Sequence, residues 1–280
     1  MTRAQAVRAA AARLIEAGVD DARDEARRLL EHASDLSRAG LMAAMSAPMP
    51  EDEAARFEAA LSRRTAREPL SHILGVVGFW TLDLKVTADV LTPRADTETI
   101  VEAALAAISD RHAPLRILDI ATGSGAIALA LLSELAYARA VATDLSAAAL
   151  IVARENAAAT GLSERVIFKE TNWTDGVDGP FDLLVSNPPY IASAVLDTLE
   201  PEVKTFEPRL ALDGGPDGLG PYPHLFSEAK RLLAPGGTAV FEIGYDQGEA
   251  ALALARKAGF ERPSLRRDLG GRDRAVIVNI

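Results

Sequence analysis

The sequence predicts an α/β fold, in which helices cover a mostly parallel sheet, with a small all-α domain in front of it. Helical and strand patterns alternate from Asp96 to the C-terminus, which is typical of parallel sheets. The first 75 residues contain no convincing strand pattern. The chain has 280 residues, 49% of them hydrophobic, which suits one large domain and one small one.

The N-terminal part is expected to be a helical domain of residues 1–75. Apolar residues recur at helical spacing over residues 2–17 and 21–34, and an aspartate before the second stretch is placed to cap it. Gly18 is suited to end the first helix. A third helix is expected to begin at Pro50, because acidic residues follow it in the turn where the helix dipole favours negative charge.

The next segment, residues 76–95, alternates apolar and polar side chains in part and predicts a β-hairpin linker. The third part, residues 96–280, should hold the parallel sheet. Its expected helices are 97–108, 125–135, 146–160, 221–233 and 247–258, and its expected strands are 115–120, 140–143, 166–169, 181–186, 237–243, 264–268 and 274–279. The last two strands lie close together around Gly270-Gly271, which predicts an antiparallel C-terminal edge.

The composition and charge of the chain exclude or disfavour several classes of function. The chain has no cysteine, which excludes a disulfide framework, a thiolate nucleophile and a cysteine metal site. No other metal-ligand cluster is evident. The net charge is −10, of which −9 falls in residues 76–280, and this disfavours a nucleic-acid duplex lying across that part. The N-terminus lacks a signal peptide pattern, and no apolar run approaches the roughly 18 residues of a membrane span, so a cytoplasmic protein is expected.

A strand ending at Ile120 runs into a glycine-rich turn and then a helix, an arrangement that brings a ligand close to the backbone. Asp144 ends the next strand, 19 residues after Gly125, where a carboxylate can accept from both ribose hydroxyls of an adenosine. Gly123-x-Gly125-x-x-Ala128 also matches the dinucleotide fingerprint, and a turn needed only for packing is a further alternative.

Asp119 distinguishes between these cofactors. A carboxylate just before the loop is unfavourable beside a pyrophosphate, whereas it can accept a hydrogen bond from the ammonium group of an amino-acid cofactor. S-adenosylmethionine contains an adenosine, an ammonium and a carboxylate but no phosphate. The loop therefore favours S-adenosylmethionine over a nicotinamide dinucleotide.

A second motif, Asn187-Pro188-Pro189-Tyr190, follows the expected strand 181–186. Two prolines end the strand in a stiff turn. The Asn187 side-chain oxygen and the Pro188 carbonyl are both acceptors, and converging acceptors suit a planar NH2 group on an amide or a base, on which Tyr190 can stack. The alternative is a polar strand end with a proline stop.

Together these residues resemble the class I S-adenosylmethionine-dependent amino-methyltransferases, and more specifically the release factor glutamine N5-methyltransferases (the PrmC/HemK family). Residues 67–75, 90–98 and 207–219 resemble the family's junction, interdomain and post-turn segments. A sister family that methylates a ribosomal protein shares the Asn-Pro-Pro-Tyr turn, but the Pro-Arg-x-Asp-Thr-Glu segment at 93–98 favours the release-factor branch.

The resemblance implies a Rossmann-like class I methyltransferase fold and methyl transfer from S-adenosylmethionine to the amide N5 of the glutamine in the Gly-Gly-Gln loop of release factors. The helical domain would dock that partner. Neither a membrane nor direct nucleic-acid binding is implied, and a monomer is expected. The alternatives are methylation of a ribosomal-protein glutamine, or of the N6-adenine or another exocyclic amine of DNA or RNA.

The resemblance also assigns residues. The implied catalytic residues are Asn187, Pro188, Pro189 and Tyr190, and the implied cofactor-binding residues are Asp119, Ala121, Thr122, Gly123, Ser124, Gly125, Asp144, Asn172, Trp173 and Asn187. Ala121 stands where the family usually has glycine, and Asn172 where it usually has aspartate. A core role is the alternative for Trp173, and a structural role is favoured for Pro93, Arg94 and Glu98.

Overall fold

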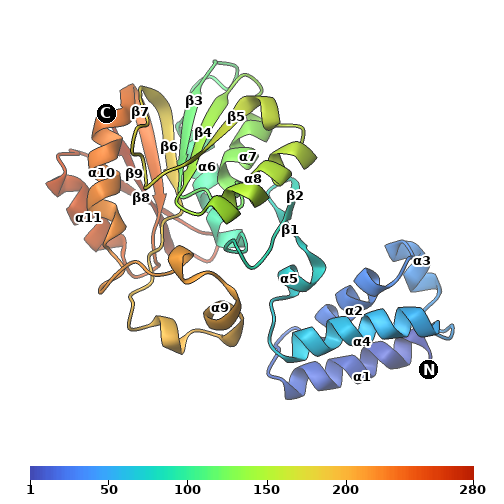
Figure 1. Cartoon of the computed structure of the whole chain (residues 1–280). Helices are drawn as coiled ribbons and strands as arrows, with labels where there is room; N and C mark the ends of the chain where they lie inside the picture. The colour runs from blue at the N-terminus through green and yellow to red at the C-terminus, as the bar shows by residue number, and fades with distance from the viewer. The chain divides into compact units, whose positions relative to one another are not determined.

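The computed structural model describes residues 1–280, whose contacts divide the chain into two compact units. The first, called the helical unit, comprises Met1–Val76 and Glu200–Phe206. The second, called the sheet unit, comprises Val77–Leu199 and Glu207–Ile280. Figure 1 shows a central sheet with helices against it in the sheet unit.

The helical unit is built from six short or medium helices. These are α1 (Arg3–Glu16), α2 (Ala22–Ala33), α3 (Arg38–Ala43), α4 (Glu51–Thr65), α5 (Leu70–Leu74) and α9 (Pro201–Phe206). Their core is mostly aliphatic, with Leu14, Leu30 and Leu61 almost wholly buried. Thr2 and Gln5 form a capping box that starts α1. Asp21 precedes α2 without a side-chain capping bond, so the expected capping of this helix by an aspartate is wrong.

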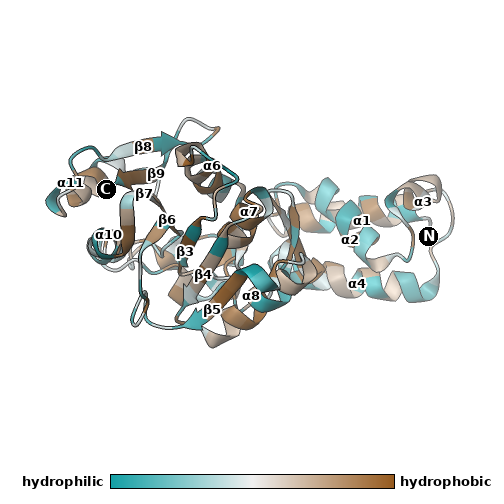
Figure 2. Cartoon of the chain, turned by 90° about the horizontal axis from the view of Figure 1, so that it is seen from above, coloured by the Kyte–Doolittle hydropathy of each residue, from teal (hydrophilic) through white to brown (hydrophobic).

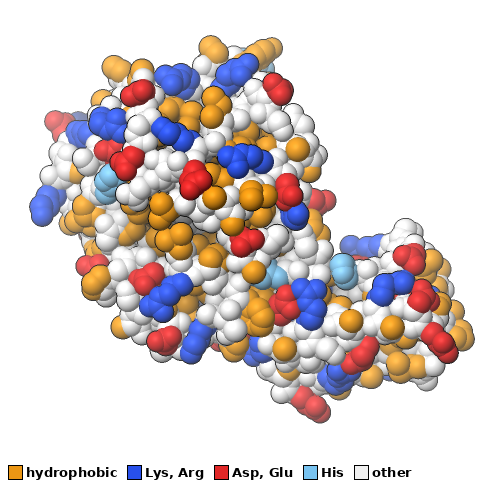
Figure 3. Space-filling view, in the orientation of Figure 1, with side chains coloured by type: hydrophobic (Ala, Val, Ile, Leu, Met, Phe, Trp, Pro, Cys, Tyr) orange, Lys and Arg blue, Asp and Glu red, His pale blue; other side chains and the backbone are white.

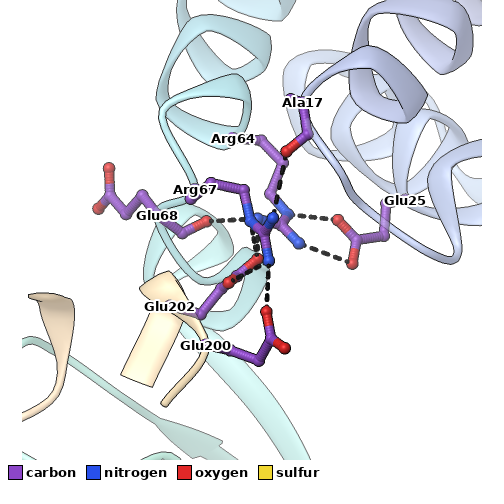
Figure 4. A network of polar contacts seen from close by, with 7 residues as sticks. All are labelled: Ala17, Glu25, Arg64, Arg67, Glu68, Glu200 and Glu202. Atoms are coloured by element: carbon purple, nitrogen blue, oxygen red, sulfur yellow. Dashed lines mark hydrogen bonds and ion pairs between the residues drawn. The ribbon is translucent and has the colours of Figure 1, made fainter. Parts of the chain in front are cut away.

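Helix α9 is far in sequence from the other helices of this unit, and ion pairs attach it to them (Figure 4). The Glu202 carboxylate accepts from Arg64 at 2.8 Å and from Arg67 at 2.6 Å. Arg64 also donates to Glu25 of α2 at 2.5 Å, and Arg67 to Glu200 at 3.1 Å. Arg64 is buried, so its guanidinium needs these carboxylates to offset the loss of hydration.

The sheet unit contains a two-stranded hairpin and a seven-stranded sheet. The hairpin is β1 (Val76–Phe79) and β2 (Leu82–Lys85). The sheet strands are β3 (Arg116–Ile120), β4 (Arg139–Asp144), β5 (Val166–Glu170), β6 (Phe181–Ser186), β7 (Leu233–Glu242), β8 (Ser264–Arg267) and β9 (Asp273–Asn279). The helices are α6 (Glu98–Ala107), α7 (Ala126–Glu134), α8 (Ala147–Ala159), α10 (Pro221–Leu232) and α11 (Gly248–Lys257), with 3-10 turns at Ala95–Thr97, Ser163–Arg165, Leu196–Thr198 and Arg209–Ala211.

The sheet order is β5-β4-β3-β6-β7-β9-β8. Strands β3 to β7 pair in parallel, whereas β9 pairs antiparallel with both β7 and β8. The chain moves outward in one direction from β3 through β4 to β5 and then returns to the other side of β3 for β6. A parallel sheet with this reversal has a crevice at the carboxyl ends of the strands beside the reversal, where ligands bind.

Two apolar cores lie on opposite faces of this sheet. Side chains of β3 alternate between them, with Ile117 packing in the core that contains α6 and α7, and Leu118 in the core that contains α10 and α11. Helix α7 is buried over most of its surface, and Figure 2 shows α7 and β9 coloured mostly as hydrophobic. Burial on both faces explains why these strands read as continuous apolar runs.

The predicted fold class is confirmed: a Rossmann-like, mostly parallel sheet with an antiparallel C-terminal edge and a helical N-terminal region. Strand β7 begins at Leu233 instead of at Gly237, because its first residues pair with Phe181 across an irregularity in the ladder. Helices α3, α5 and α9 were not predicted. Each has at most six residues, too few for a recognisable period.

Candidate active site

Three neighbouring strand ends define the candidate site. Ile120, the last residue of β3, is level with Thr143 of β4 and Ser186 of β6. The glycine-rich loop, Asp144 and the Asn-Pro-Pro-Tyr turn follow these residues along the chain. The parallel register therefore brings together at one edge three features that are far apart in the sequence.

A cavity of about 470 Å³ lies at this edge, within the size range of small-molecule sites. Nine of the predicted site residues line it: Ala121, Thr122, Gly123, Ser124, Asp144, Asn172, Trp173, Asn187 and Pro189. The other predicted site residues, Asp119, Gly125, Pro188 and Tyr190, are not part of its lining. Of these, Asp119 contacts the lining directly, because its carboxylate accepts from the Thr122 hydroxyl at 2.6 Å.

The glycine-rich loop has an unusual backbone. Gly123 and Gly125 have φ angles of +56° and +84°, and Ala121 also has a positive φ, of +57°. A left-handed conformation is unfavourable for alanine because of its Cβ atom. At Gly125, a Cβ would come within 3.3 Å of the Leu129 side chain, and the positive φ angle would in any case strain a residue that has a Cβ. The loop therefore keeps the left-handed backbone conformation that glycine favours, even though alanine occupies position 121.

Asp119 lies beneath this loop and is fully buried. Its Oδ2 atom accepts from the Thr122 hydroxyl at 2.6 Å and from the Ala128 amide at 3.2 Å, while Oδ1 has no partner. Burial raises the pKa of this carboxyl to about 7. A nearby cation would favour the ionised form and offset the free-energy cost of burying it. We therefore expect this carboxylate to attract a positively charged group of a ligand.

Asp144 forms the neighbouring wall of the cavity. Its two oxygens accept from the backbone amides of Gly123 at 2.8 Å and Ser146 at 2.9 Å. Burial raises its pKa, whereas these two hydrogen bonds lower it. The amides fix the carboxylate in place, and its remaining lone pairs can accept from hydroxyl groups of a ligand.

An aromatic side chain lies on another wall. The Trp173 ring is half-buried, and its centroid is 5.9 Å from that of His224, which also lines the cavity. Trp173 has a positive φ of 52°, and Asn172 beside it is exposed. Trp173 also packs against the core that contains α10 and α11, so its ring serves both that core and the cavity.

In the Asn-Pro-Pro-Tyr turn, Asn187 lines the cavity and its Nδ2 donates to Thr97 Oγ1 at 3.3 Å. Its Oδ1 is enclosed and has no hydrogen-bond partner. The Tyr190 hydroxyl donates to Glu242 at 3.1 Å, and the Tyr190 carbonyl accepts from Gln247 at 2.9 Å. The turn is therefore held at its far end and keeps one unpaired acceptor beside the cavity.

The loop at residues 213–220 packs directly on this turn. A Cβ at Gly214 would come within 2.8 Å of both the Pro189 carbonyl oxygen and the Tyr190 Cα, and Ile191 forms an isolated bridge with Asp213. Only glycine fits at position 214 without displacing the turn. This contact explains why the stretch that follows the turn has glycine at position 214.

Comparison with known proteins agrees with this geometry. The family model described as PrmC N-terminal domain matches residues 5–75, and the one described as methyltransferase small domain matches residues 99–203. The release factor glutamine methyltransferase of Cereibacter sphaeroides is 46% identical over 100% of this chain and 99% of its own length, and that of Caulobacter vibrioides is 45% identical over 99% and 96%. The chain belongs to the release factor glutamine methyltransferases.

A solved methyltransferase from Pyrococcus furiosus shares the fold of this family member, with a TM-score of 0.51 and 18% identity over 71% of this chain and 88% of that chain. The predictions of family, fold class and enzyme class are confirmed. In addition, no helix of this methyltransferase is both long and apolar enough to cross a membrane.

Of the three residues that were expected to be structural, Arg94 and Glu98 have structural partners in this methyltransferase, whereas Pro93 lines the cavity. Arg94 pairs with the buried Glu207 at 2.7 Å, and Glu98 accepts from the backbone amide of Trp80 at 2.7 Å. The carboxylates of Glu207 and Glu202 are both held in ion pairs.

Sequence reasoning did not find Thr97 or Glu242. Thr97 lines the cavity, and Glu242 lies behind the turn with 1% of its surface exposed. In the sequence, Glu242 stands out as a single acidic residue within the apolar run Ala239–Ile243. Such an acid in a buried strand requires a polar partner and therefore suggests a role.

Proposed function

We propose that this chain transfers a methyl group from S-adenosylmethionine to the side-chain amide nitrogen of the glutamine in the Gly-Gly-Gln loop of peptide chain release factors. One observation carries the proposal. Asn187 Oδ1 is an enclosed acceptor without a partner, at the same sheet edge as Asp144 and the glycine-rich loop. A buried acceptor without a partner is costly, so it marks a place where a donor from a ligand is expected.

The cavity residues fit S-adenosylmethionine. We assign Asp144 to the ribose hydroxyls, Asn172 and Trp173 to the adenine, and the glycine-rich loop from Ala121 to Gly125 to the amino-acid part. The unpaired Oδ1 of buried Asp119 supports a cationic group nearby, even though Asp119 does not line the cavity. Bound S-adenosylmethionine supplies a methyl group on a positively charged sulfur.

The Asn-Pro-Pro-Tyr turn is assigned to the glutamine. Asn187 Oδ1 and the Pro188 carbonyl would accept the two N–H bonds of the amide, which orients the nitrogen and raises its electron density as positive charge develops. Preorganised acceptors of this kind act as an oxyanion hole of reversed sign. Pro189 lines the cavity and limits the motion of the turn.

Tyr190 stays a prediction as the residue that stacks on the amide plane. In the structure its hydroxyl is bonded to Glu242 and its ring does not line the cavity. The contact that supports a role for Tyr190 is thus the anchoring of the turn. After transfer, the nitrogen gives up its extra proton to solvent water, and no side chain is assigned to take it.

An exocyclic amine of a DNA or RNA base presents the same NH2 group as a glutamine amide. The acceptors of the turn therefore do not distinguish a nucleic-acid substrate from a protein substrate. Charge favours the protein substrate. The chain carries a net charge of −10, and on the face shown in Figure 3 basic and acidic side chains are intermixed without a continuous basic field. Long nucleic acids are bound mainly through such basic fields.

We also propose that the helical domain of residues 1–75 docks the release factor, and that the protein acts as a monomer in the cytoplasm, where translation termination occurs. The match to the PrmC N-terminal domain supports a family-specific role for residues 5–75. Deletion of a few docking residues is therefore expected to raise KM for the protein substrate without changing the affinity for the cofactor.

The test is an incubation of the enzyme with tritiated S-adenosylmethionine and purified release factor, a release factor with the loop glutamine changed to alanine, or mixed DNA and RNA. We expect one methyl group, located by mass spectrometry on the loop glutamine, in the first sample alone. Label in the nucleic acids and none in the release factor would refute the proposed substrate. Asn187→Ala should lower kcat by about 10²–10³.

A further inference from the structure

A buried asparagine holds the glycine-rich loop from outside the cavity lining, and the proposed mechanism does not use it. Asn156 lies on α8 and is 1% exposed. Its Nδ2 donates to the Ser124 carbonyl at 2.9 Å and to the Lys85 carbonyl at 3.0 Å, while its Oδ1 accepts from the Lys85 amide at 2.7 Å. The side chain therefore connects the loop with the last residue of the hairpin strand β2.

The backbone partners of Asn156 leave its side-chain amide only one orientation. The Lys85 amide can only donate, so it faces the side-chain oxygen, and the two carbonyls can only accept, so they face the NH2 group. All three partners are backbone groups, which carry no charge and do not titrate. Aspartate, serine and leucine do not supply two donors and one acceptor, so the three contacts together require an amide.

The hydrogen bond to Ser124 completes the anchoring of one peptide group in the loop. Asn156 holds the carbonyl oxygen of this group, and the N–H group of Gly125 donates to the Thr122 carbonyl at 2.9 Å. Both sides of the peptide plane are therefore fixed. Gly125 has a φ of +84° and comes directly before α7, so a rotation of the plane would redirect the start of that helix, where Ala126 lines the cavity.

Asn156 is itself held by the hairpin. Its amide exchanges two hydrogen bonds with the backbone of Lys85, as a residue of a neighbouring strand would. Next to this contact, Val86 after β2 and Val152 of α8 belong to one small apolar core. The hairpin and α8 thus form a packed support, and Asn156 connects that support to the loop.

We propose that Asn156 is a positioning residue for cofactor binding, which keeps the glycine-rich loop in the backbone conformation that receives the amino-acid part of S-adenosylmethionine. This inference rests on the proposed assignment of that part of the cofactor to the loop. Without the hydrogen bond to Ser124, the peptide plane is free to rotate, and only a fraction of the molecules has the binding conformation. The affinity of a ligand that uses the loop falls in proportion to that fraction.

Two ligands that differ only in the amino-acid part test this role. S-adenosylhomocysteine carries that part on its sulfur, whereas 5′-methylthioadenosine carries a methyl group in its place. Both contain the adenosine that is assigned to Asp144, Asn172 and Trp173. A general loss of stability lowers the folded fraction and weakens both ligands by the same factor, so the ratio of their dissociation constants reports on the loop alone.

We expect Asn156→Ala to weaken S-adenosylhomocysteine about 5- to 30-fold in calorimetry, because it removes one buried hydrogen bond and leaves the Ser124 carbonyl without its partner. The affinity for 5′-methylthioadenosine should stay within twofold of the wild type. In the release-factor assay, KM for S-adenosylmethionine should rise by a similar factor, while kcat stays within threefold.

Two control variants remove contacts of other kinds. Glu155→Gln removes the ion pair of the neighbouring α8 residue with the Lys85 side chain at 2.8 Å, and it does not touch the loop. Leu252→Ala leaves a cavity in the core that contains α10 and α11, which lowers the melting temperature without a change at the loop. Both variants should keep the ratio of the two dissociation constants within twofold of the wild type.

The outcomes separate this inference from the proposed function. If Asn156→Ala weakens both ligands by the same factor, or weakens neither, the positioning role is refuted and the assignment of the cofactor stands. If the wild type binds neither S-adenosylhomocysteine nor 5′-methylthioadenosine, the proposed cofactor itself is wrong.

A second variant keeps the inference testable if Asn156→Ala does not fold. Asn156→Ser retains one polar group for the buried backbone, but a hydroxyl donates only once and is shorter than the amide, so it cannot hold Ser124 and Lys85 together. We expect the affinity for S-adenosylhomocysteine to fall at least threefold relative to that for 5′-methylthioadenosine. An unchanged ratio in this variant would overturn the proposal.

Discussion

The left-handed backbone conformation of Ala121 leads to a prediction about the stability of the protein. Ala121 has φ = +57° in the glycine-rich loop, a conformation that costs an L-residue about 1–2 kcal/mol. Ala121→Gly removes this cost, but glycine also makes the unfolded chain more flexible, which offsets about 0.5–1 kcal/mol. We therefore expect the sheet unit to gain about 0.5–1 kcal/mol in the free energy of unfolding, or roughly 1–4 °C in melting temperature.

The assay uses the intrinsic fluorescence of tryptophan. Both tryptophans, Trp80 and Trp173, lie in the sheet unit, so their fluorescence during denaturation follows that unit. Ala253→Gly is the matched control, because Ala253 is exposed in the middle of α11 and has no strained backbone to relieve. It should destabilise the same unit by about 0.5–1 kcal/mol.

Ala121→Gly and Ala253→Gly must therefore shift the unfolding transition of the sheet unit in opposite directions. If Ala121→Gly destabilises the sheet unit as much as Ala253→Gly does, alanine is not strained in the loop and the argument from its φ angle is wrong. Because the loop already has the geometry that glycine adopts, the affinity for S-adenosylmethionine should change by less than threefold, which calorimetry can check.

Three further predictions concern the same edge of the sheet. Asp144→Ala should weaken S-adenosylmethionine about 10- to 100-fold in calorimetry, since it removes charge-assisted hydrogen bonds, and NAD should not bind to the wild type; an unchanged affinity would favour a different ligand. The raised pKa of Asp119, about 7, means that the cofactor-free folded state binds a proton more tightly than the unfolded state. Stability should therefore fall as pH rises from about 4 to 8, and Asp119→Asn should flatten this slope in denaturation curves. Gly214→Ala should lower kcat at least 10-fold in the release-factor assay, because its Cβ would displace the turn at Pro189; full activity would contradict that contact.

The alternation of patterns was enough to predict the parallel sheet and its antiparallel edge, since strands buried on both faces read as apolar runs and the helices between them keep their own period. The glycine-rich loop and the Asn-Pro-Pro-Tyr turn were also readable from the sequence, because glycine allows left-handed turns and proline fixes the backbone locally. Nine of the predicted site residues line one cavity.

The sequence did not show that α9, between β6 and β7, belongs to the helical unit, because that depends on ion pairs from Glu202 to arginines more than 130 residues away. The same is true of the contact of Thr97 with Asn187 and of Glu242 with Tyr190, which form only when α6 and β7 pack around the turn. Local propensity fixes where strands, turns and glycines occur along the chain. Which side chains meet behind the turn is decided by contacts between distant segments, and these form only when the sheet is assembled.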